Sequence, residues 1–533
     1  TVKIRKLSLG LPMRLPLRLA YAASLACMLA QAAPAPKPKL VVAIVVDQFR
    51  YDYLLRFRSE YKAGLARLLN EGAVYTNAHY RHAATVTAVG HSTVMSGATP
   101  SVSGIIANEW YDRESSQTVT SVSDAETKLV GGPYGATGSS PRRMLVSTVG
   151  DELKIADPNS KVIGISLKDR SAILPAGHRA DGAYWYDPDT NGWVTSSYYR
   201  DELPAWVKAV NDSHPSRKLL GAEWRPLDGP ESAKPFCTMV AGSDIRFCGG
   251  LEATPWGNEL IEDLAERAIE AENLGGRGSV DLLAISFSSN DYVGHAVGPD
   301  DPAVRDISIR TDRLLGKLLD LIDRKVGAGN SLVVLTADHG VAPVPEVNIA
   351  RKMPGGRLAD GAAPQAVTEA LTKRFGAGKW LLPASSSMLY FNLETVKAKA
   401  ADRAEVERVA AEAVRALPHI ARVYTRTELM TGQASQDEVA RAVSVGFFER
   451  RSGDLYIVPD PYYLSEGTGT SHGTPYAYDT HVPLIFWGAG IEHVRPARRV
   501  AVNDIAPTLC EILGITEPSG AKGDVLTDAL ATQ

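Results

Sequence analysis

The chain has 533 residues, of which 44% are hydrophobic and 22% are charged, a balance typical of a globular protein with a large buried core. Lysines and arginines number 57 against 61 acidic residues, so the net charge is −4. A charge of this size gives no electrostatic reason for nucleic-acid binding, so nucleic acid is not expected as a partner.

The N-terminal segment has the pattern of a secretory signal peptide. Within residues 14–33, a basic start, a short apolar run and the small-residue sequence AQA at 30–32 follow one another. The apolar run is too short to span a bilayer, so we expect residues 1–33 to be lost on export, with no stable membrane insertion afterwards. An uncleaved N-terminal anchor is the alternative.

Strand and helix patterns alternate from residue 40 onward. Apolar, often β-branched runs typical of buried strands occur at 41–47, 161–167, 282–287, 331–337 and 481–490. Helical periodicity occurs at 51–57, 63–72 and 306–325. The alternation predicts an α/β fold, a three-layer α/β/α sandwich around a mostly parallel sheet.

Two stretches interrupt this pattern and are expected to be inserted subdomains near the carboxyl ends of the strands. Residues 181–258 are rich in aromatic and turn residues, whereas residues 346–460 contain a strand–helix–strand unit. Insertions at that position would shape access to a site. The aromatic stretch has two interpretations, a small core of its own or a surface that stacks on substrate.

Six candidate metal ligands occur along the chain, five of them just after predicted strands. They are Asp47, Asp291, His295, Asp338, His339 and His472. Open α/β sheets place their sites at the carboxyl ends of strands. Three aspartates and three histidines suit two zinc-like ions with three protein ligands each, which indicates a two-metal hydrolase.

Two of these assignments have alternatives. Asp47 could instead cap the N-terminus of a helix. His472, in the glycine-rich sequence GTSHG, competes with His481, which directly precedes a predicted strand, and we favour His472 because its loop is flexible.

A second block, residues 85–108, places Thr87 before a predicted helix. A hydroxyl there meets the positive end of the helix dipole and free backbone N–H groups, which favour an alkoxide or a phosphoryl oxygen. Thr87 is therefore a candidate nucleophile, although a simple N-cap is the commoner role of such a threonine.

A third block, SLKDRS at 166–171, follows a predicted strand. If it continues as a strand, Lys168 and Arg170 point the same way and could bind phosphoryl oxygens in one cavity. A solvated charged turn is the alternative. Among the cysteines, we expect Cys237 and Cys248 to form a disulfide and Cys510 to be a buried free thiol.

These residues together resemble the alkaline phosphatase superfamily, and most closely the bacterial phosphate-irrepressible alkaline phosphatases with a threonine nucleophile. The resemblance covers the mature chain, taken as the catalytic domain at 39–533. It rests on VVDQFR, TVTAVGHSTVMSGATPSVSGIIANEWYDR, SLKDRSAILPAGH, NDYVGH, TADHG and GTSHG, in that order. Nucleotide pyrophosphatase/phosphodiesterases share the metal ligands, the threonine and the asparagine; the Lys-x-Arg pair resembles the monoesterase branch.

The resemblance implies a role for each residue. Thr87 would form a covalent phosphothreonine intermediate. One zinc ion would be held by Asp47, Asp338 and His339 and would activate Thr87, whereas Asp291, His295 and His472 would hold the second, which activates water. Asn108, Lys168 and Arg170 would bind the non-bridging phosphoryl oxygens.

The expected function is a zinc-dependent alkaline phosphatase acting on small-molecule phosphate monoesters, periplasmic or secreted from a bacterial cell, with a monomer as the default state. A phosphodiesterase or nucleotide pyrophosphatase on the same scaffold is the first alternative. A catalytically inactive phosphate- or metal-binding protein is the second, although neither a ligand nor the nucleophile is missing. A sulfatase is disfavoured because Thr87 stands where a cysteine or serine would be modified.

Overall fold

The computed structural model describes residues 37–230, 232–240, 247–383, 387–433 and 437–531. The predicted signal peptide lies outside these residues. Among the residues that are described, no helix combines the length and apolar character that crossing a bilayer requires.

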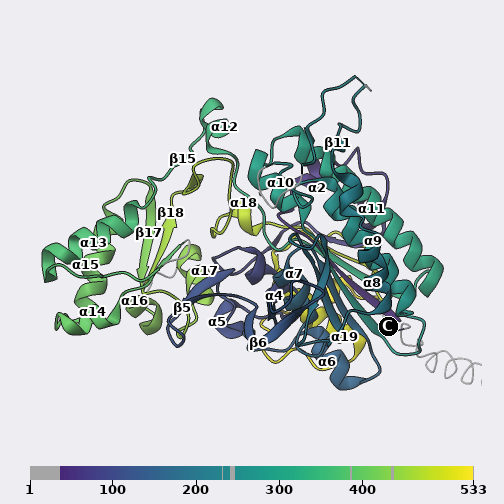
Figure 1. The fold of residues 1–533 in the computed structure, drawn as a ribbon, viewed down its shortest axis with the longest axis horizontal. Helices are drawn as coiled ribbons and strands as arrows, with labels where there is room; N and C mark the ends of the chain where they lie inside the picture. The colour runs from purple at the N-terminus through teal and green to yellow at the C-terminus, as the bar shows by residue number, and fades with distance from the viewer. Residues whose placement is uncertain (1–36, 231, 241–246, 384–386, 434–436, 532–533) are drawn as a thin grey trace, which may run out of the picture.

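A ten-stranded sheet forms the centre of the molecule (Figure 1). Across the sheet, the strands are β2 (Ala73–Tyr75), β20 (Leu484–Gly488), β14 (Ser331–Thr336), β1 (Leu40–Val46), β13 (Asp281–Phe287), β8 (Val162–Ser166), β9 (Gly182–Asp187), β10 (Gly192–Ser196), β6 (Ser123–Val130) and β7 (Thr137–Ser139). Strands β1, β8, β13 and β14 are buried along their whole length because helices cover both faces.

The parallel arrangement is confined to the middle of the sheet. Strands β14, β1, β13, β8 and β9 pair in parallel, whereas β20, β2, β10, β6 and β7 add antiparallel strands at the two edges. The expected α/β sandwich is therefore confirmed, with a mixed sheet. The connection between β9 and β10 is too short for a crossover, which is why this pair runs antiparallel.

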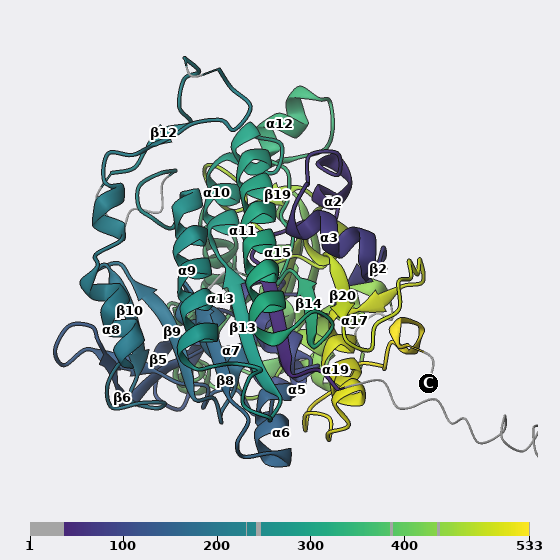
Figure 2. The same cartoon turned by 90° about the vertical axis from the view of Figure 1, so that its right-hand side faces the viewer.

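Helices form one layer on each side of the sheet (Figures 1 and 2). One layer contains α3 (Gly64–Glu71), α8 (Ala205–Asp212), α9 (Pro255–Ala271), α10 (Ser289–Val297) and α11 (Pro302–Val326). The other contains α4 (Thr87–Ser96), α6 (Val149–Ala156), α7 (Asp169–Ala176) and α19 (Ile505–Leu513).

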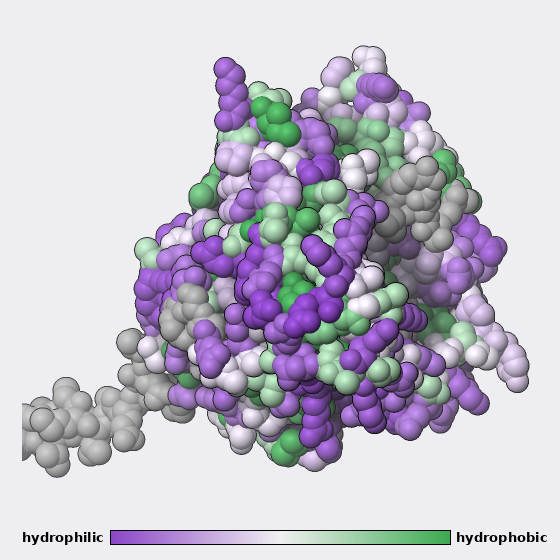
Figure 3. Space-filling model, turned by 90° about the vertical axis from the view of Figure 1, so that its left-hand side faces the viewer, coloured by the Kyte–Doolittle hydropathy of each residue, from purple (hydrophilic) through white to green (hydrophobic). Residues whose placement is uncertain are grey.

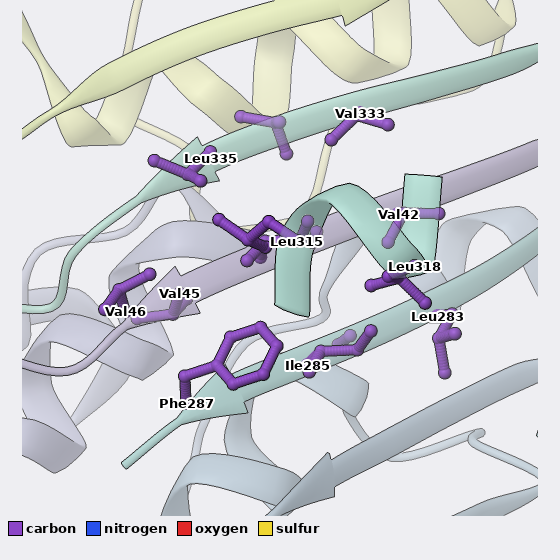
Figure 4. Close-up of a cluster of buried hydrophobic side chains, with 14 of the residues drawn as sticks. Val42, Val45, Val46, Leu283, Ile285, Phe287, Leu315, Leu318, Val333 and Leu335 are labelled. Carbon is purple, nitrogen blue, oxygen red and sulfur yellow. The ribbon is translucent and has the colours of Figure 1, made fainter. Parts of the chain in front are cut away.

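Helix α11 shows how the sequence specifies the core. Asp301 caps its N-terminus by accepting a hydrogen bond from the N–H of Ala303, and Pro302 occupies its first turn. Its apolar face includes Leu315 and Leu318, which lie over strands β1, β13 and β14 (Figure 4). This packing fixes the strands whose ends carry the predicted ligands.

The two interrupted stretches differ in structure. Strands β9 and β10, both within residues 181–258, belong to the central sheet, so this stretch is not wholly separate from it. Its aromatic residues pack on one another, as Tyr184 does on Trp206 and Tyr186 on Trp193. The interpretation as an aromatic core is the one that this packing supports.

Residues 346–460 contain a three-stranded sheet of their own, at the left of Figure 1. Its strands are β16 (Met388–Leu389), β18 (Leu455–Pro459) and β17 (Ile420–Thr425), and its helices are α13 (Ala362–Phe375), α14 (Leu393–Ala398), α15 (Arg403–Arg415), α16 (Arg426–Thr431) and α17 (Glu438–Gly446). We refer to this part as the inserted subdomain. Its side of the molecule presents mostly hydrophilic residues with scattered hydrophobic ones (Figure 3).

Two buried contacts fasten the inserted subdomain to the rest of the molecule. Asp454 is fully buried and accepts hydrogen bonds from Arg113, from Arg403 and from the N–H of Phe391. Arg451 donates to the carbonyl oxygens of Gly104 and Arg143 in the main body. These bonds join the inserted subdomain to the main body at Arg113, Gly104 and Arg143.

The remaining elements are short. They are α2 (Tyr53–Arg56), β3 (Ala78–His79), α5 (Pro100–Ser103), β4 (Glu109–Asp112), β5 (Gln117–Thr120), η1 (Ser216–Leu219), β11 (Glu223–Trp224), β12 (Cys237–Thr238), α12 (Pro345–Ala350), β15 (Gly356–Arg357), β19 (Tyr463–Leu464), α18 (Ala477–Thr480), β21 (Val500–Ala501), η2 (Val502–Asp504) and η3 (Thr527–Ala529). The expected disulfide between Cys237 and Cys248 is present, and Cys510 is a buried free thiol.

Candidate active site

The predicted ligands converge at one edge of the central sheet. Asp47 directly follows β1, Asp338 and His339 follow β14, and α10, which carries Asp291 and His295, follows β13. Adjacent parallel strands end at the same edge, so these side chains meet there. The one-turn spacing of Asp291 and His295 brings both to one side of α10, and Asp47 caps no helix.

The first ligand group consists of Asp47, Asp338 and His339, whose ligand atoms all lie within 4.8 Å of one another. His339 Nε2 is 3.5 Å from Asp47 Oδ1 and 3.3 Å from Asp338 Oδ2. These three atoms are buried and have no hydrogen-bond partner among the described residues. Buried polar atoms are normally satisfied, and a metal ion would satisfy all three at once.

The second ligand group contains Asp291, His339 and His472, so His339 lies between the two groups by distance. His295 is adjacent, with its Nε2 at 3.2 Å from Asp291 Oδ1 and 3.2 Å from His472 Nε2. The predicted set of Asp291, His295 and His472 is thus brought together, with His339 as a neighbour of both groups.

Backbone carbonyls orient all three histidines in the same way. The Nδ1 atoms of His295, His339 and His472 lie 2.8, 2.9 and 2.8 Å from carbonyl oxygens of Thr470, Gly340 and Thr85. A carbonyl only accepts, so Nδ1 carries the proton and Nε2 presents its lone pair to the site.

The short distance between the Nε2 atoms of His295 and His472 supports a cation site. If both atoms lack a proton, they repel each other at 3.2 Å unless a positive charge lies beside them. Burial and the neighbouring His339 and His295 also lower the pKa of His472 well below its ordinary value, which keeps it neutral and able to bind metal.

Lys168 is the only ammonium that the described residues place among these acids. Its Nζ donates to Asp47 Oδ2 and to Asp291 Oδ2, both at 2.6 Å. Burial alone would lower the pKa of Lys168, but Asp291 and Asp47 raise it, so the side chain stays charged. Burial would likewise raise the pKa of Asp291, yet Lys168 and His295 hold it well below its usual range.

Three buried carboxylates therefore face a single ammonium. Burial, followed by repulsion from Asp338, raises the pKa of Asp47 well above its ordinary value. The surplus of negative charge and the unpartnered ligand atoms both fit divalent metal ions, and the donor set of carboxylates and imidazoles suits them chemically.

Thr87 is the first residue of α4, and Val86 occupies the N-cap position with an extended backbone. Thr87 is therefore the first residue inside the helix and not its N-cap, so the simple N-cap interpretation is wrong. Helix α4 packs directly on the Asp338 backbone, since a Cβ at Gly90 would lie 2.2 Å from the carbonyl oxygen of Asp338. The glycine thus permits α4 to approach the first ligand group.

Asn108 is linked to the same helix end. Its Oδ1 accepts a hydrogen bond of 2.8 Å from the backbone N–H of Ala88, the residue after Thr87. Because the amide oxygen is engaged there, the Nδ2 group remains the donor that Asn108 can offer to a ligand.

The strand-like geometry expected for SLKDRS is wrong. Lys168 is the N-cap of α7, and Arg170 lies in the first turn of that helix. The two side chains therefore have different surroundings: Lys168 reaches the buried carboxylates, whereas Arg170 lines the open cleft. The sequence ends the strand at Ser166, because Asp169 starts a helix with an acidic residue at its positive end.

Gln48 is a site residue that the sequence reasoning did not single out. Its backbone N–H donates to Asp338 Oδ1 at 3.1 Å, and its Nε2 donates to Asp291 Oδ1 at 2.6 Å. The residue has a left-handed φ of 60°, which is unusual for a glutamine and occurs where surrounding structure enforces it. Gln48 thus connects both ligand groups, and its position directly after Asp47 was the available signal.

His91 was also missed. It lies one helical turn after Thr87, and its Nδ1 is 2.8 Å from the carbonyl oxygen of Thr87 and 3.2 Å from Asp338 Oδ2. Its Nε2 is 2.8 Å from the hydroxyl of Ser286 on β13. A neutral His91 that accepts from Ser286 donates its Nδ1 proton to the carbonyl oxygen of Thr87, and so holds the first turn of α4 beside Asp338.

A cleft of about 570 Å³ opens above the ligand groups. Asn108, Arg170, His295 and His472 line it together with residues of the inserted subdomain, among them Met388 and Tyr456. None of the described residues of 181–258 lines this cleft. His481 is elsewhere, stacked between Tyr51 and His79, so of the two histidine candidates only His472 lies in the site.

The fold and this arrangement define a class of protein. The family model described as type I phosphodiesterase / nucleotide pyrophosphatase matches residues 41–481, which is most of the chain. The chain belongs to the type I phosphodiesterase / nucleotide pyrophosphatase family.

Particular relatives are alkaline phosphatases by name. The chain is 35% identical over 520 residues to alkaline phosphatase PafA of Elizabethkingia meningoseptica. The match covers 93% of this chain and 95% of the relative. It is 35% identical over 518 residues to alkaline phosphatase PhoV of Synechococcus elongatus, at 93% of each chain. The crystal structure of wild-type PafA matches with a TM-score of 0.87 and 34% identity, covering 94% of this chain and all of that one. The predicted resemblance is confirmed.

Proposed function

We propose that this protein is a zinc-dependent alkaline phosphatase that hydrolyses phosphate monoesters through a phosphothreonine intermediate on Thr87. The observation that carries the proposal is the convergence of three unpartnered ligand atoms, from Asp47, Asp338 and His339, beside the helix that begins at Thr87. The relatives named alkaline phosphatase over nearly the whole chain support the same activity.

Thr87 Oγ1 forms a bond to phosphorus while the bond to the leaving alcohol breaks. Water then attacks the phosphothreonine, which releases inorganic phosphate and restores the hydroxyl. The positive end of α4 favours the developing alkoxide at Thr87 and the incoming phosphoryl oxygens.

Asn108, Arg170 and Lys168 favour the dianionic phosphoryl group of a monoester. Asn108 Nδ2 and the Arg170 guanidinium donate to non-bridging oxygens. The positive charge of the buried Lys168 adds to the electrostatic attraction of the phosphoryl group. A diester carries one charge fewer and a second organic group where these donors need an oxygen, so it should be the poorer substrate.

Asp47, Asp338 and His339 would hold one zinc ion, and Asp291, His295 and His472 would hold the other. When bound, the ions would supply positive charge to the reaction and lower the pKa of the nucleophile. Gln48 keeps Asp338 and Asp291 in position for this role.

The catalytic domain is residues 39–533, which acts as a monomer in the periplasm or outside the cell once residues 1–33 are removed. The inserted subdomain at 346–460 forms one wall of the cleft and so limits which esters can enter. The stretch at 181–258 is the second predicted insertion, and its aromatic packing supports a structural role.

The test is the ratio of kcat/KM for p-nitrophenyl phosphate to that for bis-p-nitrophenyl phosphate, measured with zinc at alkaline pH and repeated with a chelator. The proposal predicts a strong preference for the monoester that the chelator abolishes and added zinc restores. A preference for the diester would contradict it and favour a phosphodiesterase.

A further inference from the structure

The cleft above the ligand groups is lined by charged residues of both signs. We refer to the part of the cleft at Arg170, where a phosphoryl group would bind, as its floor. Arg170 is the one lysine or arginine among the described residues that line it. Three carboxylates, those of Glu109, Asp169 and Glu466, also line it. Asp169 is 3.9 Å from the Arg170 guanidinium, so it belongs with the phosphoryl-binding floor, whereas Glu109 and Glu466 are exposed.

Glu466 is held in place by its backbone and not by its carboxylate. Arg357 donates to the carbonyl oxygens of Glu466 and Gly469, at 2.7 and 2.9 Å, and pairs its own charge with Glu346. Within the described part of the chain, the Glu466 carboxylate makes no ion pair. Its negative charge is therefore available to whatever occupies the cleft.

The cleft is lined by apolar as well as polar residues. Val86 and Val122 come from the main body, and Met388 and Tyr456 come from the inserted subdomain. A leaving group attached to a phosphoryl group at Arg170 would thus lie in a cleft that offers both carbon atoms and the carboxylates of Glu109 and Glu466.

We propose that this part of the cleft is a leaving-group subsite that selects phosphate monoesters of amino alcohols over monoesters whose leaving group is anionic. The inference rests on the proposed phosphatase activity. A phosphoryl dianion at the floor and an ammonium group beside Glu466 complement the two charges of the cleft, whereas a carboxylate or further phosphate on the leaving group is repelled. Phosphorylated carboxylic acids and nucleoside polyphosphates are the disfavoured class.

The test compares two esters with two-carbon leaving groups of opposite charge, O-phosphoethanolamine and phosphoglycolate. Their kcat/KM ratio is measured for the wild type, Glu466→Gln and Glu466→Lys. The reference substrate is p-nitrophenyl phosphate, whose leaving group carries neither an ammonium nor a carboxylate. Comparing the ratio between variants cancels the intrinsic reactivity of the esters. The matched control is Glu369→Lys, which reverses the charge of an exposed glutamate of the inserted subdomain that does not line the cleft.

We expect the wild type to prefer O-phosphoethanolamine and Glu466→Lys to lower that preference by about fivefold or more at low salt, with Glu466→Gln between the two. Glu369→Lys should change it less than about twofold, since exposed charges at a distance are screened. The proposed subsite would be overturned if the ratio is unchanged in Glu466→Lys or if the wild type prefers phosphoglycolate. Continued hydrolysis of p-nitrophenyl phosphate would show that the phosphatase activity itself still stands. If the wild type hydrolyses no monoester at all, the proposed function itself fails and the subsite falls with it.

Discussion

Two buried carboxylate clusters in this protein have opposite hydrogen-bonding states. At the edge of the central sheet, Asp47 and Asp338 each keep one oxygen without a hydrogen-bond partner. In the inserted subdomain, Asp454 is equally buried, but Arg113, Arg403 and the N–H of Phe391 satisfy it. The comparison indicates that the first cluster is built to bind a ligand and the second to hold the structure together.

This difference divides the expected effects of mutation. Substitutions around the sheet edge should change metal content and turnover, because the unpartnered atoms there are the reactive part of the molecule. Substitutions around Asp454 should change the free energy of unfolding, because its partners join the inserted subdomain to the main body.

The largest effect is expected from Thr87→Ala. Removing the nucleophile should lower kcat for p-nitrophenyl phosphate by roughly ten-thousandfold or more, as loss of a nucleophile does in other hydrolases. Thr87→Ser is the matched control, since it keeps the hydroxyl and should retain measurable turnover. Turnover close to that of the wild type in Thr87→Ala would remove Thr87 from the reaction.

Next in size is Arg170→Ala. Loss of a charged donor to the phosphoryl oxygens should reduce kcat/KM for a monoester by roughly a hundred- to a thousandfold. Arg170→Lys retains the charge but not the planar pair of donors, and should recover only part of the rate. A loss of less than threefold in Arg170→Ala would rule out its role in binding the phosphoryl group.

Asp454→Asn tests the structural cluster. It leaves Arg113 and Arg403 without their buried counter-charge, so the free energy of unfolding should fall by about 3 kcal/mol. Urea unfolding provides the measurement, and the zinc content of the folded variant should match that of the wild type. Loss of bound zinc without loss of stability would reverse the assignment of the two clusters.

Gln48→Leu tests the opposite case at the sheet edge. It removes the hydrogen bond to Asp291 but leaves the backbone N–H that binds Asp338. Losing a group that orients a metal ligand should weaken zinc retention by roughly ten- to a hundredfold. Zinc content after dialysis against a graded chelator is the measurement, with Gln365→Leu, an exposed glutamine of α13, as the control. Retention equal to the wild type would show that Gln48 does not position Asp291.

Much of the site could be predicted because its residues follow unmistakable strands. The apolar runs before Asp47, Asp291 and Asp338 specify buried parallel strands, and parallel strands end together. The position of His472 also followed from its motif, although its contacts did not.

Other features depend on tertiary context that a single sequence does not carry. The role of Gln48 comes from a left-handed backbone that only the surrounding ligands enforce. Lys168 turned out to be a helix N-cap because the boundary between β8 and α7 is set by packing, and the short sequence is compatible with both states. Strands β9 and β10, which pair antiparallel with each other beside the parallel middle of the sheet, were missed since their aromatic composition resembled an insertion.

The most direct test of the central claim is the stereochemical course at phosphorus. A monoester made chiral at phosphorus with oxygen isotopes would be turned over in the presence of an alcohol acceptor, and the configuration of the transferred phosphoryl group measured. Attack by Thr87 followed by attack of the acceptor inverts phosphorus twice, so the account predicts net retention. Net inversion would show a single displacement and contradict a covalent intermediate on Thr87.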